Sequence, residues 1–268
     1  MRAWTLGSGS RGNALLLESE DTRVLIDAGY PPRELARRLS AISIAPESIS
    51  ALIVTHEHWD HARGVAAAQS RWRWHVFGSA GTLDGVRRLD RSHATTVSPG
   101  ISWTVGALTL ELLRVSHDAT APTAVIATAQ RTGFRAGVAH DLGCIGQDLR
   151  RGLLDLDLLL LESNHDEEML RSGPYPRFLQ ERIAGRGGHL SNGQAAMLAR
   201  DVASRTLAQL VLLHLSEANN TSPRAIAASE QALRSRRITC AVSAAPQDRV
   251  AGPFGLARRA ATQLSLGL

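Results

Sequence analysis

Residues 50–61 read SALIVTHEHWDH. The first six residues form a largely apolar run of the length of a buried strand, and three histidines and an aspartate follow within the next six. A strand fixes the start of the loop and a tight turn directs alternate side chains inward, so these groups can converge on one point. Imidazole and carboxylate are ligands of Zn, Mn and Fe. The stretch therefore predicts a metal-binding loop at the end of a buried strand.

Three further potential ligands each follow an apolar stretch elsewhere in the chain. His117 comes after LELLRVS, Asp141 after FRAGVAH and His214 after LAQLVLL. A histidine-rich loop that is merely solvated surface would not be accompanied by such residues. We therefore expect a metal site assembled from the ends of several strands.

The rest of the chain alternates predicted strands and helices, which is typical of an α/β fold. The first hairpin comprises ALLLE from residue 14, a turn over 19–22 and RVLID, and Pro31 and Pro32 open an amphipathic helix. The pattern further predicts a strand at 74–77, a helix at 79–89, short strands within 101–115, 123–128 and 134–139, helices at 145–152, 191–204 and 222–235, and strands at 156–161, 209–213 and 238–243. Residues 163–190 read as one long irregular loop. A chain of 268 residues fits a single domain, 1–268, without an inserted domain.

Composition restricts the class of protein. Apolar residues make up 44% of the chain and charged residues 21%, which excludes a disordered chain. The start MRAWTLGSGSRGN lacks the basic and apolar regions of an export signal, and the apolar segment 153–161 is interrupted by Asp155 and Asp157. The two cysteines, Cys144 and Cys240, have no paired spacing and are expected to be small buried residues. These features predict a cytoplasmic protein without membrane association.

The basic residues are unusual because all 30 are arginines, and the formal net charge is +5. Arginine binds phosphate as a planar fork, which suits a nucleic-acid partner. A GC-rich genome would produce the same bias, so the charge does not decide between the two explanations.

The motifs resemble a known family. The pattern HxHxDH at 56–61, preceded by Asp27 of VLIDAG and followed by His117, Asp141 and His214, is similar to the metallo-β-lactamase fold superfamily. Within it, SGSxGN at 8–13, SHDA at 116–119, ESNHD at 162–166, GHLSN at 188–192 and HLSxxNN at 214–220 resemble the YycJ/WalJ group of bacterial proteins. This resemblance implies a four-layer αββα sandwich with a dinuclear metal site at one edge of the sheets.

The resemblance also implies a division of the ligands. His56, His58 and His117 would hold one divalent ion, Asp60, His61 and His214 the second, and Asp141 would bridge them. The two ions, Zn or Mn and alternatively Fe, would hold a bridging hydroxide as the nucleophile. Asp27 would orient a ligand histidine and raise its basicity; otherwise it is a turn residue before Gly29.

GHLSN points to a substrate contact. Ser191 and Gln194 have the spacing of a capping box, so the first turn of the following helix, from Asn192, would present free N–H groups to a phosphate. His189 would donate a proton to a leaving oxygen, as in phosphodiesterases of this fold, or would bond a neighbouring loop. Ser8, Ser10 and Asn13 would line the same cleft or close the first hairpin.

The sequence is less specific about the other histidines and about Trp59. His140 departs from the Thr that related sequences often carry, and we expect it to pack or to support a ligand. His165 is a substrate contact or supports the site, and His75 and His93 are ordinary surface or core residues. Trp59 is expected to pack under the metal site.

The ligand set predicts a metal-dependent hydrolase and leaves the substrate open. A β-lactamase is disfavoured because Asp60 replaces a thiolate ligand and no export signal is present, and a thioesterase because only 54 residues follow His214. The capping box with His189, the arginine-only basic residues and the resemblance to the YycJ/WalJ group together favour a phosphodiester hydrolase. The resemblance further implies a DNA 5′–3′ exonuclease, with DNA rather than RNA as substrate. The alternatives are a small-molecule cyclic phosphodiesterase, a thioesterase or lactonase, and a non-catalytic metal-bearing binding protein.

Overall fold

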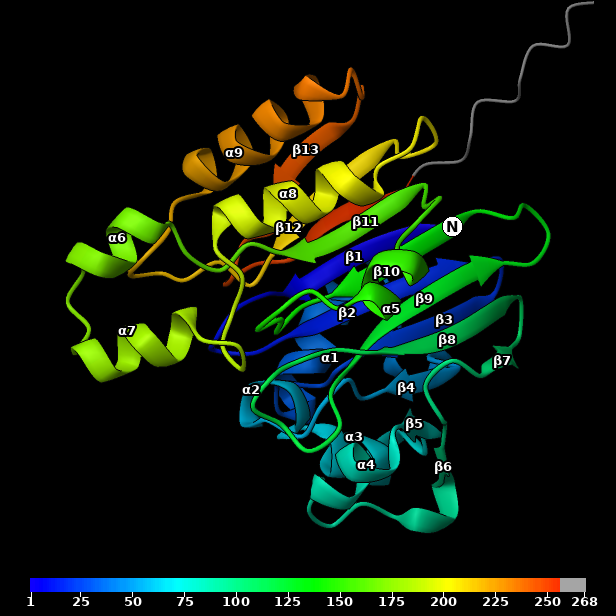
Figure 1. The fold of residues 1–268 in the computed structure, drawn as a ribbon. Helices are drawn as coiled ribbons and strands as arrows, with labels where there is room; N and C mark the ends of the chain where they lie inside the picture. Colours follow the sequence, from blue (N-terminus) through cyan, green and yellow to red (C-terminus); the bar gives the residue numbers. More distant parts are fainter. Residues whose placement is uncertain (256–268) are drawn as a thin grey trace, which may run out of the picture.

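Two seven-stranded sheets pack face to face, with helices on both outer faces (Figure 1). The computed structural model describes residues 1–255. The first sheet contains, in spatial order, β14 (Ala251–Phe254), β1 (Arg2–Gly7), β2 (Ala14–Ser19), β3 (Thr22–Ile26), β4 (Ala51–Ile53), β5 (Val76–Gly78) and β6 (Ala94–Thr96). The second contains β13 (Ala241–Ala244), β12 (Gln209–Leu213), β11 (Leu158–Glu162), β10 (Arg135–Ala139), β9 (Thr123–Ala129), β8 (Leu108–Arg114) and β7 (Ser102–Val105).

The helices form the two outer layers and the connections at one end. They are α1 (Pro32–Ser40), α2 (Trp59–Ala62), α3 (Val65–Trp72), α4 (Ala80–Gly85), α5 (Gln147–Gly152), α6 (Glu167–Ser172), α7 (Arg177–Ala184), α8 (Asn192–Val202) and α9 (Ser222–Ser235), with short 3₁₀ turns at Pro46–Ser48 and Arg91–His93. The four-layer αββα arrangement expected from the sequence is confirmed. Within residues 1–255, none of the helices combines the length and apolarity that a bilayer span requires.

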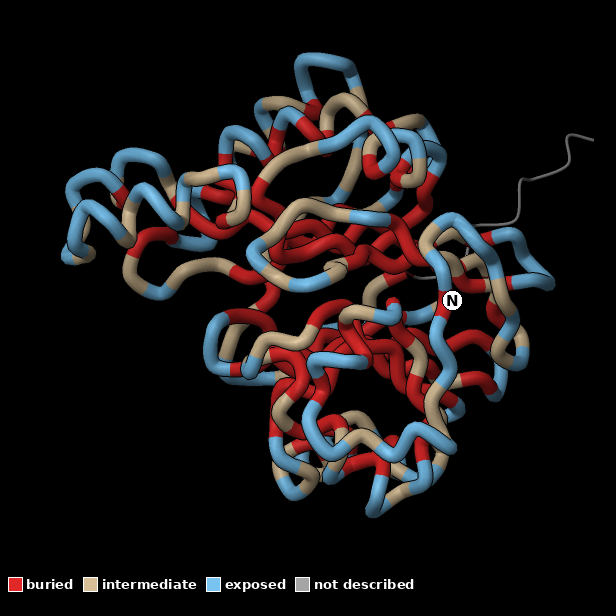
Figure 2. Tube along the Cα trace, turned by 60° about the horizontal axis from the view of Figure 1, so that its bottom comes forward, coloured by how far each residue is buried: buried red, intermediate tan, exposed pale blue. Residues whose placement is uncertain are grey.

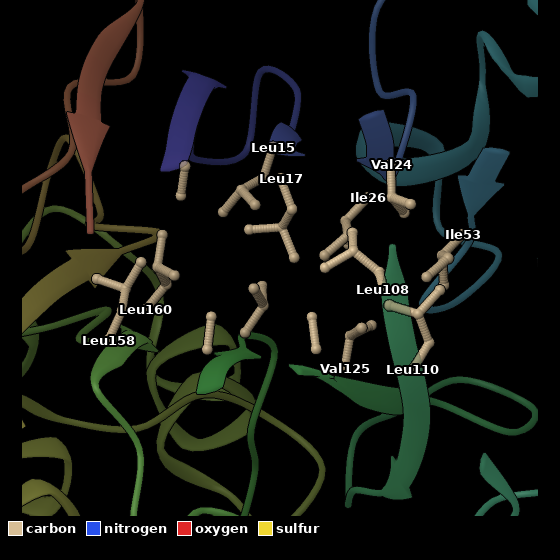
Figure 3. Close-up of a cluster of buried hydrophobic side chains, with 14 of the residues drawn as sticks. Leu15, Leu17, Val24, Ile26, Ile53, Leu108, Leu110, Val125, Leu158 and Leu160 are labelled. Atoms are coloured by element: carbon tan, nitrogen blue, oxygen red, sulfur yellow. The ribbon is translucent and has the colours of Figure 1, made fainter. Parts of the chain in front are cut away.

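Strand periodicity explains the layers. Leu15 and Leu17 of β2 point into the core between the sheets, whereas Leu16 packs against α1 on the outer face. In β11, Leu158 and Leu160 enter the same central core, which Figure 3 shows between the two sheets. Each fully buried leucine stabilises the fold by roughly 1.5–3 kcal/mol, so the sandwich holds the strand ends rigidly.

Several predicted elements need correction. Residues 163–190 are not one irregular loop, because they contain α6 and α7, which project from the sandwich with mostly exposed surfaces (Figures 1 and 2). Strands β1 and β14 and helix α3 were not predicted. Strand β1 lies between β14 and β2 and is buried on both faces, so it lacks the alternation that marks a half-buried strand.

Candidate metal centre

The candidate site lies where strands of both sheets end. Strand β3 pairs with β4 in parallel, and β10, β11 and β12 pair in parallel with one another. A polar residue lies at or within three positions of the carboxyl end of each of these strands. Those residues are Asp27 after β3, His56 beyond β4, Asp141 beyond β10, Glu162 at the end of β11 and His214 after β12. Carboxyl ends of parallel strands share one sheet edge, where ligand sites of α/β proteins usually form. The strand pairing therefore brings together residues that are far apart in the chain.

Backbone conformation aims three of these side chains. Asp27, Asp141 and His214 have positive φ angles of 61°, 55° and 55°. Such left-handed conformations are uncommon outside glycine, and they cluster at functional sites, where the surrounding structure enforces them. Here each one turns the chain sharply as it leaves a strand.

His56, His58 and His117 form a first group of potential ligands. Their ring centroids are 4.7 to 5.3 Å apart. The Nδ1 of His117 donates to the carbonyl of Gly188 at 2.9 Å, and the Nε2 of His58 donates to that of Asp118 at 3.1 Å. The other nitrogen of each ring is therefore available to a metal ion. In residues 1–255 the buried Nε2 of His56 has no hydrogen-bond partner.

Asp60, His61 and His214 form a second group, with one ligand atom from each within 4.8 Å of the others. The Nδ1 of His61 donates to Asp27 at 2.7 Å, which turns its Nε2 toward Asp60, 3.5 Å away. The buried Nε2 of His214 lies 3.6 Å from Asp60 and, among the described residues, makes no hydrogen bond. Buried polar atoms are rarely left unpaired, so these nitrogens indicate that a cation completes the site.

Asp141 lies between the two groups. Its carboxylate oxygens are 3.0 Å from Nε2 of His61, 3.8 Å from Nε2 of His117 and 3.6 Å from Nδ1 of His214. All seven predicted ligands thus meet at one edge of the sandwich. The donor set of imidazoles and carboxylates fits one or more divalent cations such as Zn or Mn.

Electrostatics reflect this crowding of imidazoles and carboxylates. Burial opposes the charged form of His214, but Asp141, Asp60 and Glu162 raise its pKa to about 10. Burial alone would raise the pKa of Asp60, but His214 and His61 outweigh it and hold the pKa below its ordinary value. At His56 burial dominates and lowers the pKa, which favours the neutral, ligating form.

Asp27 supports the loop that carries the first ligands. It is fully buried and accepts hydrogen bonds from the backbone N–H and the hydroxyl of Thr55, both at 2.8 Å, as well as from His61. Burial alone would raise the pKa of Asp27, but His61 and His140 lower it, so the residue is a carboxylate. These contacts fit the orienting role that was predicted for it.

His140 is buried and bridges two carboxylates. Its Nδ1 lies 2.9 Å from Asp141 and its Nε2 3.3 Å from Asp27. This geometry fits the predicted supporting role and leaves neither nitrogen free for a metal.

Glu162 has no predicted role but occupies a central place. One of its oxygens accepts the Nδ1 proton of His189 at 2.7 Å, and the other accepts the backbone N–H groups of Leu142 at 2.8 Å and Leu190 at 3.0 Å. Burial opposes ionisation, yet His189 and His214 lower the pKa of Glu162 to about 2. The available signal was its position at the end of the apolar run 158–161.

A cavity of about 250 Å³ opens at the two ligand groups. Ser10 and His189 line it, together with Leu179, Arg182 and Ile183 from α7 and its C-terminal end. The Nε and Nη2 groups of Arg182 both donate to one carboxylate oxygen of Asp118, which also lines the cavity. Helix α7, in the segment predicted to be irregular, therefore forms one wall of the site.

Three predicted substrate contacts do not line this cavity. The capping box of Ser191 and Gln194 is confirmed, but the Ser191 hydroxyl also donates to Glu167 at 2.6 Å. Asn192 is buried and bonds Ser163 and Asn220, and His165 is buried behind the site. These side chains are hydrogen-bonded or enclosed within the protein and do not reach the cavity. A phosphate contact through the backbone N–H groups at the start of α8 stays a prediction.

Asn13 is buried next to the ligands. Its Nδ2 lies 2.9 Å from Nε2 of His61 and 3.2 Å from Asp60, and its Oδ1 accepts the N–H of Gly9. It holds the 8–13 turn against the ligand loop rather than lining the cavity.

Other predictions concern residues around the site. Trp59 does not pack under the metal loop, because its side chain is 73% exposed. Cys144 and Cys240 are only partly buried and unpaired. His75 and His93 lie outside the donor groups found in residues 1–255 and bond Thr95 and Asp90.

The sequence is similar to those of known proteins. Residues 7–122 match the model of the metallo-beta-lactamase superfamily. The exodeoxyribonuclease WalJ of Streptococcus pneumoniae is 33% identical over 223 residues, which cover 80% of this chain and 81% of that protein. The exodeoxyribonuclease YycJ of Bacillus anthracis is 28% identical over 235 residues, covering 86% and 88%.

A solved structure shares the fold. The metallo-beta-lactamase fold protein YhfI of Bacillus subtilis superposes with a TM-score of 0.70 over 93% of this chain and 98% of that one, at 16% identity. Together with the ligand geometry, these matches show that the chain belongs to the metallo-β-lactamase superfamily, and within it to the family of WalJ and YycJ, as a metal-dependent hydrolase.

Proposed function

We propose that this protein is a dinuclear metal-dependent deoxyribonuclease that degrades DNA from a 5′ end. The observation that carries the proposal is the convergence of seven imidazole and carboxylate donors beside a cavity that five of them and His189 line. The names of the relatives WalJ and YycJ support DNA as the substrate. The motif resemblance described above supports the 5′–3′ polarity.

The proposed ligands fall into the two groups described above. His56, His58 and His117 would hold one cation and Asp60, His61 and His214 the other, with Asp141 between them. When bound, two divalent cations supply a water molecule of lowered pKa and positive charge for the phosphoryl oxygens. Asp27 keeps Nε2 of His61 directed to the ligand group by accepting its Nδ1 proton.

In this proposal His189 protonates the leaving oxygen. Glu162 holds its Nδ1 proton, so its Nε2 is the nitrogen that can act on a substrate in the cavity. Burial alone would disfavour the imidazolium form of His189. The Glu162 carboxylate outweighs burial, so the pKa of His189 is raised. His189 would thus enter the reaction as a general acid, and Glu162 would position it.

The proposal is tested by metal analysis of the purified protein together with cleavage of end-labelled DNA and RNA. We expect bound divalent metal and progressive shortening of DNA from the 5′ end. Asp60→Ala should lose both metal and cleavage. His93→Ala, which removes a histidine outside the ligand groups, is the matched control and should retain both.

Each alternative has a distinct outcome. Activity confined to cyclic or aryl phosphodiesters would favour a small-molecule phosphodiesterase. DNA binding without cleavage by the metal-loaded protein would favour a binding protein. Shortening from the 3′ end would contradict the polarity and leave the hydrolase assignment intact.

A further inference from the structure

Two exposed aromatic side chains flank the candidate metal centre. Residues 1–255 expose five large apolar side chains, and the aromatic ones among them are Trp59 and Phe178, which are 73% and 72% exposed. In the sequence, Trp59 lies between His58 and Asp60, which both line the cavity at the ligand groups. Phe178 precedes Leu179, which also lines it. An exposed tryptophan contributes little to the core, and beside a candidate active site its ring is available as a contact surface for a ligand.

Trp59 borders a second cavity that continues from the first. This groove has a volume of about 560 Å³ and shares Ser10 with the cavity at the ligand groups. Its wall includes Tyr30, Trp59 and three arginines, Arg11, Arg38 and Arg63. Asp248 is the one carboxylate residue among its lining residues. Three guanidinium groups and one carboxylate therefore line this extension of the candidate active site.

Arg63 differs from the other two arginines of the groove. Arg11 is paired with Glu217, and Arg38 with Glu34. In the part of the chain that the structure describes, Arg63 has no carboxylate within 4.0 Å. Its guanidinium is held by the carbonyls of Gly29 at 2.6 Å and Arg11 at 2.7 Å. Its charge is thus fixed in place and not neutralised, which is the arrangement that suits a phosphate.

The aromatic ring and the guanidinium are neighbours. The guanidinium carbon of Arg63 lies 5.9 Å from the centre of the Trp59 ring. Because both residues belong to the segment that carries Asp60 and His61, their positions are tied to the ligand loop. An exposed ring beside a fixed positive charge in a groove is the combination by which proteins bind single-stranded nucleic acid.

We propose that the groove between Trp59 and Arg63 is a nucleotide-binding subsite for a single strand of DNA. A base stacks on Trp59, and Arg63 binds the phosphate next to the one that is cleaved. The subsite rests on the proposed function and deepens it, because it explains how a polymer rather than a small ester is held at the metal centre.

The test measures binding of a fluorescent, phosphorothioate-linked single-stranded oligonucleotide to the metal-loaded protein by anisotropy. Stacking of one base contributes about 1–3 kcal/mol, so Trp59→Ala should weaken binding by about 5- to 150-fold. Trp59→Phe keeps an aromatic face and should restore most of the affinity. Ile101→Ala, which removes another exposed apolar side chain away from both cavities, should bind like the wild type.

Arg63 is tested through the salt dependence of binding. Arg63→Gln should reduce the slope of log affinity against log salt concentration by about 0.7, the value for one phosphate contact on a single strand. Arg63→Lys keeps the charge and should keep the slope. Thermal unfolding of each variant separates this effect from loss of the contacts to Gly29 and Arg11. Arg71→Gln, on α3 outside the groove, is the control for loss of one charge.

The outcomes separate the subsite from the proposed function. If the wild type binds and cleaves DNA while Trp59→Ala and Arg63→Gln bind it unchanged, the subsite is wrong and the nuclease proposal stands. If the wild type hydrolyses small aryl phosphodiesters but binds no oligonucleotide, the proposed function fails, and with it the subsite. Equal weakening by Trp59→Ala and Ile101→Ala would also overturn the subsite.

Discussion

Replacement of Glu162 by Gln tests how the proton on His189 is held. One oxygen of Glu162 accepts from His189, and the other accepts the backbone N–H groups of Leu142 and Leu190. A glutamine has a single acceptor oxygen. If that oxygen keeps the two backbone bonds, its NH₂ group faces Nδ1 of His189, which must then accept. The proton of His189 moves to Nε2 and the imidazolium form is no longer favoured.

The expected magnitudes follow from these contacts. Loss of general-acid catalysis should lower kcat on DNA by about 10²- to 10⁴-fold. Stability should change by less than about 1 kcal/mol because the backbone donors stay paired, whereas Glu162→Ala leaves two of them unpaired and should cost roughly 2–6 kcal/mol. His189→Ala should match the kinetic loss of Glu162→Gln.

A comparison of leaving groups gives the decisive assay. Hydrolysis of a p-nitrophenyl phosphodiester needs little help from an acid because nitrophenolate is a stable leaving group, so Glu162→Gln should reduce that rate far less than DNA cleavage. Metal content should be measured for each variant, since Glu162 lies 3.4 Å from His214. An equal loss on both substrates at full metal content would refute the assignment of His189 as the acid.

Four further predictions concern metal, core, backbone and pH. Chelation should lower the unfolding temperature, and readdition of Zn or Mn should restore it. A free metal concentration of a thousand times Kd should add about 4 kcal/mol to the free energy of unfolding. An unchanged unfolding temperature would contradict the metal site. Leu17→Ala, at the centre of the inter-sheet core, should cost about 2–5 kcal/mol in urea unfolding. Gly29→Ala should abolish cleavage, because its Cβ would lie 1.8 Å from the carbonyl oxygen of Asp60, whereas the matched Gly146→Ala, with open space around it, should be active. The hydrogen bond from Arg37 lowers the pKa of Glu34 to about 2, although burial opposes this shift. The ionised Glu34 therefore stabilises the fold above its unfolded pKa near 4.5, and this stabilisation is lost as the pH falls toward 2. Glu34→Gln should destabilise the protein at pH 7 and not at pH 2, which measurement of the unfolding temperature across an acid titration will check.

The local sequence determined which residues could bind a metal and where several strands and helices begin. The run 50–61 indicated a buried strand followed by ligands, and the structure brings His117, Asp141 and His214 to it. The capping box at Ser191 and the hairpin of β2 and β3 were also readable, because caps and turns depend on residues within a few positions of each other.

Long-range packing decided the rest. Glu162 acquires its partners only when β11 pairs beside β10 and β12, and Ser191 and Asn192 are enclosed only because α6 and the 214–220 segment close over them. Helix α7 has no buried residue and is not part of the core, yet its Leu179 and Ile183 form a wall of the cavity. Hydrogen bonding and burial between distant segments are properties of the assembled sandwich. For this reason the candidate ligands could be proposed from the sequence, whereas the supporting carboxylate Glu162 and the groove beside Trp59 could not.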